Sequence, residues 1–324
     1  MSISATIVGV GSKLPEKIVT NEMLEQIVDT SDKWIKKRTG ISERRICTTE
    51  DSNSLAVDAT KMALESAKVD ANDVDIIIGT TITGDYATPA IANFVQKAIG
   101  CEDSISFDIA AGCTAFIYAL GIITSMMETM NLETGVIVSS EVLSGTLDWT
   151  DRSSCVLFGD GAGAVVVKRS DKNRIKFPLL HAIPDTEDVL YIKNAKNDNP
   201  WSKGMANDDI SLYMNGNEVF AFAADAVEKT LKQLDEKMGD TKIDKIVPHQ
   251  ANSRIIRFAA SNTDFELDQF YVNVDKCANT SSATIPIALC EANENGWLKK
   301  GDNVALVGFG AGLSYGGIVI EWAL

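Results

Sequence analysis

Histidine is scarce in this sequence, and the cysteines lack the spacing of metal ligands. Only His181 and His249 are present, and the six cysteines, at positions 47, 101, 113, 155, 277 and 290, form no CxxC pair. Zinc sites and disulfide frameworks need ligands or cysteines at characteristic spacings. The pattern therefore excludes a histidine-rich metal site and disfavours disulfides. It also leaves two candidates for any chemistry that needs an imidazole.

Basic charge and long apolar runs are also in short supply. Thirty Lys and Arg face 45 Asp and Glu, and the net charge of −15 repels nucleic acids and anionic membranes, so we expect neither as a partner. The N-terminus reads as a strand and a Gly/Pro turn instead of a signal peptide. No apolar run reaches the about 20 residues that span a bilayer. Residues 114–130 are shorter and include Glu128, so we expect a buried core helix and a cytoplasmic protein.

Short β-branched runs alternate with helix-length amphipathic segments, which is typical of an α/β chain with layered sheets. The 324 residues suffice for one large core or two domains of roughly 150 residues each. The predicted strands include residues 6–10, 74–78, 135–139 and 164–167, and the predicted helices include residues 55–67 and 217–237. The polar stretch 185–209 is predicted to be a surface excursion.

A weak internal repeat relates the two halves at an offset near 167 residues. Four segments of the first half match segments of the second in the same order: 58–64 with 225–231, 74–76 with 243–245, 107–109 with 272–274, and 136–138 with 305–307. Two such units would pack about a pseudo-twofold axis. We therefore expect an N-terminal half, 1–170, with Cys113, and a C-terminal half, 171–324, which brings Asn279 close to that cysteine.

Cys113 lies where a strand-like run, Ala111 and Gly112 lead into an apolar helix. The free amides and the dipole of a helix N-terminus favour thiolate, so the thiol pKa, ordinarily about 8.5, is predicted to be lowered. The alternative is a buried cysteine that acts as a small inert hydrophobe.

Three further segments carry candidate chemistry. His249 follows a strand that ends at Pro248, and strand ends are where α/β proteins place their sites, although a structural histidine is the alternative. Asn279 lies in a turn whose hydroxyls could cap the next helix, so a capping role is open for it. Residues 308–312 form a glycine loop between two strands, which presents backbone amides to a ligand but lacks the Lys-Ser/Thr of a phosphate-binding loop.

Five motifs spread over almost the whole chain resemble the β-ketoacyl-acyl carrier protein synthase III family of thiolase-fold condensing enzymes. They are TNEMLEQIVDTSDKWIKKRTGISERRI, LDWTDRSSCVLFGDGAGAVVV, VPHQANSRII, NTSSATIPIAL and GFGAGLSYG, in the order and approximate spacing of that family. The resemblance implies a thiolase-like fold of two pseudo-twofold-related halves in αβαβα layers, and a homodimer.

The same resemblance implies the reaction and its residues. Cys113 would accept an acyl group from acyl-CoA, and His249 and Asn279 would donate hydrogen bonds to the thioester carbonyl of malonyl-acyl carrier protein during decarboxylative condensation. This reaction starts fatty acid synthesis and needs no cofactor beyond the coenzyme A thioester substrates. The backbone amides of Cys113 and Ala311 would form the oxyanion hole of the acyl-enzyme.

Binding residues follow from the resemblance as well. Trp34, Arg38 and Arg152 match positions that contact the adenine and phosphates of coenzyme A, and Thr88 matches a position at the far end of the acyl pocket, contributed across the dimer. The alternative for Trp34, Arg38 and Arg152 is ordinary surface packing and ion pairing.

Two features set the chain apart from the family pattern. Ala278 and Ala311 replace usual glycines, which costs about 1 kcal/mol wherever φ is positive. Only Arg254 and Arg257 mark the helix expected to receive the acidic carrier protein, so the contact is weak or the acceptor is a coenzyme A thioester or another small molecule.

Two other functions remain open. One is a relative in secondary metabolism that makes polyketides or quinolones or acylates an amine or hydroxyl. The other is a non-catalytic scaffold.

Overall fold

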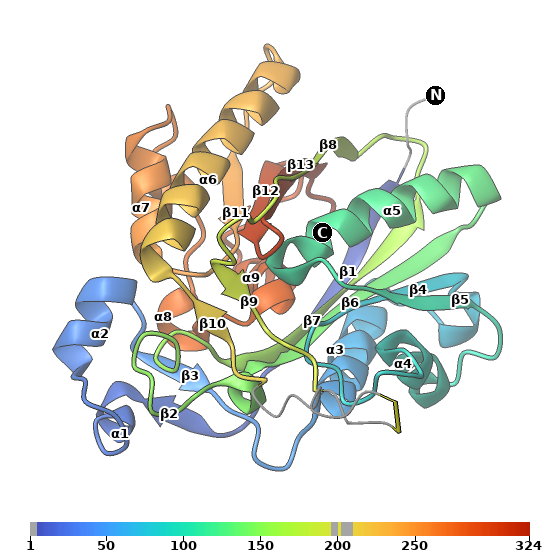
Figure 1. Cartoon of the computed structure of the whole chain (residues 1–324). Helices are drawn as coiled ribbons and strands as arrows, with labels where there is room; N and C mark the ends of the chain where they lie inside the picture. The colour runs from blue at the N-terminus through green and yellow to red at the C-terminus, as the bar shows by residue number, and fades with distance from the viewer. Residues whose placement is uncertain (1–4, 196–199, 202–209) are drawn as a thin grey trace.

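Two mixed β-sheets organise the chain in the computed structural model, which describes residues 5–195, 200–201 and 210–324 (Figure 1). The first sheet contains two parallel pairs of strands and the second contains one, and two antiparallel pairs follow in each sheet. The first sheet has the order β1 (Ala5–Lys13), β7 (Asp160–Arg169), β6 (Thr134–Val142), β4 (Ile76–Thr80) and β5 (Ile105–Ile109). The second has the order β11 (Lys245–Pro248), β12 (Asn303–Gly310), β13 (Ser314–Glu321) and β8 (Ile175–Ala182).

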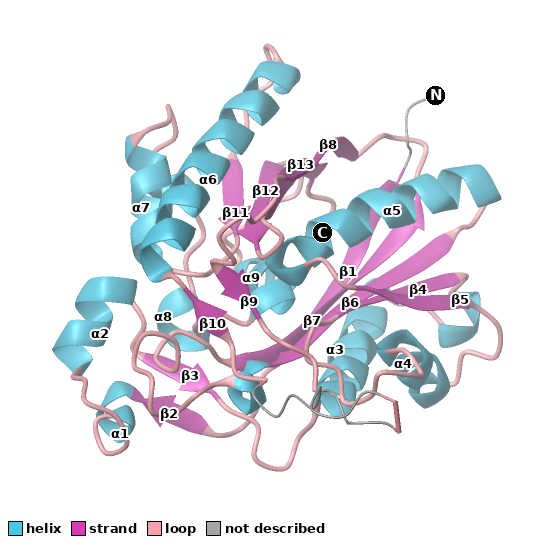
Figure 2. Ribbon diagram, in the orientation of Figure 1, coloured by secondary structure: helices cyan, strands magenta, loops and turns pink. Residues whose placement is uncertain are grey.

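Helices cover both sheets and fill the space between them, which gives five layers (Figure 2). The outer face of the first sheet carries α3 (Ser52–Ala67) and α4 (Ile91–Ile99), and that of the second carries α6 (Gly216–Met238) and α7 (Ser253–Ser261). The central layer holds α5 (Ala115–Met130) and α9 (Thr284–Glu294). The layered αβαβα fold expected from the sequence is confirmed.

The remaining short strands and α-helices lie near one end of the two sheets (Figure 1). They are the hairpin of β2 (Ile18–Thr20) and β3 (Glu43–Arg45), the helices α1 (Asn21–Leu24), α2 (Asp32–Thr39) and α8 (Val274–Cys277), and the pair β9 (Leu190–Tyr191) and β10 (Tyr213–Met214).

The strand order reflects the internal repeat. β4, β6, β7 and β1 follow one another in the first sheet as β11, β12, β13 and β8 do in the second, with the same directions. One predicted match is wrong: residues 272–274 form a loop and the start of α8, and the counterpart of β5 is a single parallel bridge between Ile246 and Phe270. The two halves share one apolar core, and the boundary near residue 170 stays a prediction.

Side-chain caps explain where several helices begin. Asp51 and Ser54 form a reciprocal capping box at the start of α3, so the helix begins three residues before the predicted one. The carboxylate of Asp108 on β5 accepts hydrogen bonds from the amides of Ile91 and Ala92 at 2.6 and 3.0 Å, and it thereby supplies the cap that α4 lacks in its own sequence.

Among the described residues, one helical run, Gly112–Met130, is long and apolar enough to span a membrane. It has 19 residues, and the mean hydropathy of its apolar window is 1.3. Its inner face packs among Ile78, Ile137 and Ile318 of the two sheets, and 56% of the apolar window is buried in the protein. As predicted, α5 is a core helix.

Candidate active site

A cavity of about 1190 Å³ lies where the two halves meet, and the three predicted catalytic residues all line it. Cys113 reaches it from the start of α5, His249 from the end of β11, and Asn279 from the turn before α9. Cys113 and Asn279 are 166 positions apart in the sequence, yet both line this cavity. The folding of two similar βα units about one interface accounts for this convergence.

Cys113 sits in a 3₁₀ turn, Gly112–Thr114, that leads directly into α5. Its thiol is half-buried and donates a hydrogen bond to the Ser281 hydroxyl at 3.5 Å. Burial raises the pKa of the thiol to about 12; the hydrogen bond to Ser281 opposes the rise, and the charge of Glu141 adds to it. The predicted lowering of this pKa is therefore wrong, because removal from water outweighs the effect of the helix N-terminus.

His249 is almost fully buried, packs edge-on against Phe309, and is held through its Nδ1 atom by the Thr284 hydroxyl at 2.6 Å. Burial lowers the pKa of the imidazole to about 3, so the ring is neutral near pH 7. A contact of 2.6 Å fits an O–H donor better than an N–H donor. The Thr284 hydroxyl can also donate to the Ser281 carbonyl, but that contact is longer, at 3.1 Å. We therefore assign the Thr284 proton to Nδ1, which leaves Nε2–H as the donor.

Asn279 is fixed in a rigid turn. Its amide donates to the carbonyl of Leu157 at 3.0 Å, and its carbonyl accepts from the amide of Gly159 at 3.1 Å. Its side-chain Oδ1 accepts from the amide of Ser281 at 2.8 Å, which orients the Nδ2 donor away from that amide. Asn279 therefore stabilises its own turn, although no side-chain cap forms at the 3₁₀ turn or the helix that follows, and it offers an N–H donor at the cavity.

The glycine-rich segment lies directly against Cys113. β12 continues to Gly310, so the loop is shorter than predicted and comprises Ala311, Gly312 and Leu313. A side chain on Gly310 would lie only 2.9 Å from Cβ of Cys113 and 3.0 Å from its amide nitrogen, so only glycine fits there. Cys113 and Ala311 both line the cavity, and the oxyanion hole from their backbone amides stays a prediction.

The two alanines that replace glycines differ in their backbone. Ala278 has φ 56° and ψ −159°, a region that favours glycine, so the expected strain exists at this position. Ala311 is not among the residues with positive φ, and no penalty applies there.

Trp34, Arg38 and Arg152 lie together at the edge of the cavity. The indole of Trp34 has the Arg38 guanidinium 5.6 Å and the Arg152 guanidinium 5.3 Å from its ring centre. Trp34 and Arg38 line the cavity, whereas Arg152 stands beside it and also contacts Asp29 at 3.4 Å. The structure thus places the Trp34 ring and two guanidinium groups side by side, at positions for which the resemblance implied coenzyme A binding.

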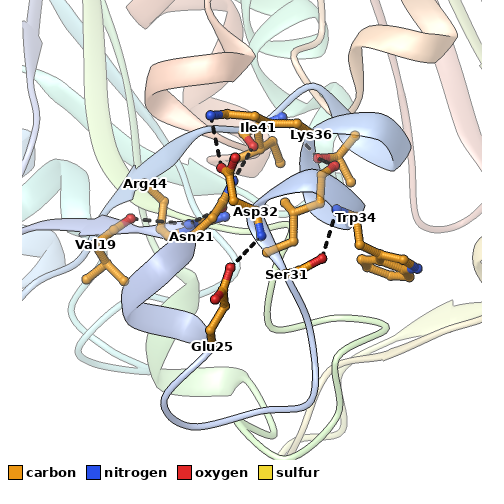
Figure 3. A network of polar contacts seen from close by, with 11 residues as sticks. Val19, Asn21, Glu25, Ser31, Asp32, Trp34, Lys36, Ile41 and Arg44 are labelled. Atoms are coloured by element: carbon orange, nitrogen blue, oxygen red, sulfur yellow. Dashed lines mark hydrogen bonds and ion pairs between the residues drawn. The ribbon is translucent and has the colours of Figure 1, made fainter.

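A buried polar network holds the segment that carries Trp34 (Figure 3). Arg44 is fully buried and donates to Asn21 Oδ1 at 2.9 Å, and Asn21 Nδ2 donates to Asp32 Oδ1 at 3.0 Å. Ser31 Oγ accepts the amide of Trp34 at 3.2 Å and caps α2. Sequence analysis did not single out Arg44, because only the fold shows that this arginine faces inward.

The two predicted carrier contacts, Arg254 and Arg257, are exposed on α7, and Arg254 also packs over the Phe220 ring at 5.1 Å. Their surroundings are more basic than the sequence of α7 suggested. Helix α2 packs on α7, with Asn252 Nδ2 donating to the carbonyl of Arg38 at 3.1 Å. The last turn of α2 carries Lys36, Lys37 and Arg38, so cations from two distant segments share this face.

Thr88 is exposed and does not line the cavity of its own chain, so its predicted contribution across a dimer stays a prediction. The stretch 185–209 differs from its predicted place. Its described part is more than a surface excursion, because β9 pairs with β10 and apolar residues of these strands pack toward Leu143 and Phe158 in the cavity wall. The rest of that stretch, apart from residues 200–201, lies outside the described residues.

Sequence reasoning missed three polar residues of the site: Ser281, Thr284 and Glu141. The hydroxyls of NTSSAT were read only as possible caps, but no side-chain cap forms at the start of the 3₁₀ turn or of α9. Ser281 instead contacts Cys113, and Thr284 contacts His249. Glu141 is the only charged residue in the run 134–142, which was a signal of a buried acid.

Comparisons with known proteins agree with this geometry. Family models for 3-oxoacyl-[acyl-carrier-protein] synthase III and for its C-terminal domain match residues 107–182 and 234–322. The chain is 45% identical over 323 residues to a β-ketoacyl-[acyl-carrier-protein] synthase III of Clostridium acetobutylicum, covering 98% of this chain and 99% of the relative. It is 42% identical to one of Clostridium beijerinckii, with 98% of each chain covered.

Solved structures give the same result. A 3-oxoacyl-[acyl-carrier-protein] synthase III of Aquifex aeolicus superposes with TM-score 0.91 at 37% identity, covering 98% of this chain and 100% of that one. A priming β-ketosynthase of the R1128 polyketide pathway superposes with TM-score 0.91 at 30% identity, covering 99% and 97%.

Proposed function

The chain belongs to the 3-oxoacyl-[acyl-carrier-protein] synthase III family and is an acyl-transferring condensing enzyme of fatty acid synthesis, and we propose that Cys113, His249 and Asn279 carry its reaction. The observation that carries this proposal is the convergence of one thiol and two neutral N–H donors on a single cavity. A scaffold protein has no need of this arrangement.

In the first half-reaction, the Cys113 sulfur attacks the carbonyl carbon of an acyl-CoA thioester and expels the coenzyme A thiol. The amides of Cys113 and Ala311 face the oxygen on which negative charge develops. Preorganised donors of this kind typically contribute about 3 kcal/mol each to the transition state. The close packing of Gly310 on Cys113 supports this role, because it brings the loop backbone to the sulfur.

In the second half-reaction, the malonyl group of malonyl-acyl carrier protein loses CO₂ and leaves an electron pair on its α-carbon. This pair forms the new carbon–carbon bond to the acyl carbon, while the bond from the acyl carbon to the Cys113 sulfur breaks and releases the thiolate. His249 Nε2–H and Asn279 Nδ2–H donate to the thioester oxygen of the enolate. The buried imidazole is neutral near pH 7 and still carries one N–H group. This group can donate a hydrogen bond, which supports the role. The reaction uses coenzyme A thioesters as substrates and requires no further cofactor.

The cavity mouth suits coenzyme A. Trp34 offers a flat face for the adenine, and Arg38 and Arg152 offer guanidinium groups for its phosphates. Arg254 and Arg257, reinforced by the cations of α2, form the surface that meets the acidic carrier protein. The exposed position of Thr88 supports a homodimer in which this residue completes the partner's acyl pocket. We place this activity in the cytoplasm.

Intact-protein mass spectrometry after incubation with a panel of acyl-CoAs tests the proposal. The wild type should gain one acyl group, Cys113→Ser should gain none, and the added mass identifies the preferred chain. His249→Ala should still be acylated but should lose CO₂ release from malonyl-acyl carrier protein. The same adduct on wild type and Cys113→Ser would refute the nucleophile.

A related activity in secondary metabolism is the second candidate, supported by the likeness to the R1128 priming β-ketosynthase. Transfer of the acyl group to an amine or hydroxyl without release of CO₂ would favour it over condensation.

A further inference from the structure

Two segments that contribute to the cavity wall, residues 81–83 and the turn 279–282, meet at one buried carboxyl group. It belongs to Glu141, one residue before the end of β6, and β6 runs between β4 and β7 in the first sheet. The side chain is fully buried and does not line the cavity. A buried carboxyl group is costly unless hydrogen bonds replace the water that it loses. The hydrogen bonds to Glu141 come from both segments.

One donor belongs to the turn that carries Asn279. Ser282 Oγ lies 2.6 Å from Oε1 of Glu141 and 3.3 Å from the carbonyl oxygen of Thr80, so the carboxyl group is the closer acceptor. In the same turn, Asn279 Oδ1 accepts the amide of Ser281 at 2.8 Å, and the Ser281 hydroxyl contacts the thiol of the proposed nucleophile. Glu141 thus holds the turn through Ser282, while the neighbours of Ser282 face the cavity.

Two further donors belong to the segment 81–83, which follows β4. Oε2 of Glu141 accepts the amide of Ile82 at 3.1 Å and the hydroxyl of Thr83 at 2.7 Å. The Thr83 oxygen itself accepts the amide of Val142 at 2.8 Å, so its own proton is available for the carboxyl group. Ile82 lines the cavity. The same carboxyl group therefore holds a second part of the cavity wall.

We propose that Glu141 is a positioning residue that couples these two segments, so that one carboxyl group sets both the place of Asn279 and the cavity wall at Ile82. Ile82 and Ser282 lie 200 positions apart in the sequence, and each bonds a different carboxyl oxygen. A shift of either segment leaves a buried oxygen without its donor, and the cost of its removal from water remains. The anchor is rigid, because β6 is a buried strand with neighbours on both sides.

The coupling rests on the proposed function and deepens it, because the two segments serve different parts of the reaction. Asn279 donates to the enolate oxygen in the condensation step, and this bond strengthens as negative charge develops. Ile82 forms part of the wall around the substrate, and the shape of such a wall decides which acyl chains fit. Loosening the turn should therefore slow condensation, and loosening the segment 81–83 should change the choice of acyl group.

Kinetics of two variants separate these effects. Ser282→Ala should lower kcat for condensation about tenfold, the value of one buried hydrogen bond, and should change KM for malonyl-acyl carrier protein less than about twofold. Thr83→Val keeps the shape of the side chain and removes its hydroxyl. It should change the ratio of Cys113 acylation rates with a short and a long acyl-CoA by at least about threefold. Thr83→Ser retains the hydroxyl and should restore the wild-type ratio.

Hydrogen exchange of the free protein, followed by mass spectrometry of its peptides, tests the coupling without any substrate. Ser282→Ala should speed the exchange of amides in residues 81–83 about tenfold, and Thr83→Val should do the same in residues 279–282. Each effect appears in the segment that was not substituted. Exchange that rises only in the substituted segment would overturn the coupling.

Ser140→Ala is the matched control. Ser140 precedes Glu141 on β6 and is equally buried, but its hydroxyl donates to the carbonyl of Ser52 at 2.7 Å. This variant loses one buried hydrogen bond of the same strand and should leave the exchange of both segments and the kinetics unchanged. Equal effects of Ser140→Ala and Ser282→Ala would show general loosening of the strand and would overturn the proposal.

A double variant and a change at Glu141 itself complete the test. Because either single substitution breaks the same link, Thr83→Val combined with Ser282→Ala should slow condensation by less than the product of the two single effects. An effect equal to that product would contradict the link. Glu141→Gln loses one acceptor oxygen and should slow condensation and change the choice of acyl group together. If this variant does not fold by circular dichroism, the two single variants decide the question.

The coupling and the proposed function fail in different experiments. Acylation of wild-type Cys113, together with exchange that stays local in both variants, would overturn the coupling alone. Exchange that spreads between the two segments without any acyl adduct on the wild type would leave the coupling intact and overturn the proposed function.

Discussion

Replacing Thr284 by valine removes one hydroxyl beside His249 while it keeps the shape of the side chain. In the structure this hydroxyl lies 2.6 Å from Nδ1 of His249, a distance typical of an O–H donor. With the Thr284 proton assigned to this bond, Nδ1 is the acceptor and the proton of the neutral ring is assigned to Nε2. Thr284→Val therefore removes the interaction that selects the donor tautomer, without touching the substrate.

The size of the effect follows from the strength of that bond. A buried hydrogen bond contributes about 1.5 kcal/mol at most, which corresponds to a roughly tenfold preference for one tautomer. Condensation with malonyl-acyl carrier protein should therefore fall about tenfold in Thr284→Val, whereas acylation of Cys113 should change less than about twofold. Nδ1 is left buried without its partner, so the free energy of unfolding should also fall by about 1 to 3 kcal/mol. Thr284→Ser should restore both.

The scarcity of histidine makes the tautomer measurable. Protein labelled with ¹⁵N in histidine gives signals from His181 and His249 only, and His181→Gln assigns them. The wild type should show one protonated nitrogen, Nε2, and one unprotonated nitrogen, Nδ1, for His249, and this pattern should change in Thr284→Val. A wild-type His249 protonated on Nδ1 would refute the assignment. So would undiminished condensation by Thr284→Val.

Three further predictions concern stability and are checked by urea unfolding. Because burial lowers the pKa of His249 to about 3, from about 6.5 in the unfolded chain, only the unfolded chain gains a proton as the pH falls from 6 to 4. The unfolding free energy should drop by about 1.4 kcal/mol per pH unit from this group, and His249→Gln should remove that slope. Ala278→Gly should stabilise the chain by about 1 kcal/mol, since φ is 56° at this residue; destabilisation would show that the turn is unstrained. Arg44→Met leaves the carbonyls of Val19 and Val156 without their donor and should cost about 3 kcal/mol, and a loss under about 0.5 kcal/mol would contradict the buried network.

The sequence by itself predicted the fold class and the place of the proposed nucleophile in the chain. Alternating strands and helices gave the layered sheets, and Cys113 stands at the junction of a strand and an apolar helix because residues 105–130 contain both patterns without a break. These features depend on local periodicity. The repeat also predicted matching βα units, although it misplaced the counterpart of β5, since a single bridge leaves almost no pattern in the sequence.

Only the tertiary structure decided how the side chains of the site act. The pKa of Cys113 depends on desolvation, which no local pattern reports, and burial reversed the shift expected from the helix N-terminus. Thr284 meets His249 across 35 positions, and Ser281 meets Cys113 across 168. Such contacts arise from packing between elements that are distant in the chain. The sequence and its family resemblance therefore pointed to Cys113, His249 and Asn279, but only the fold showed which groups contact their side chains.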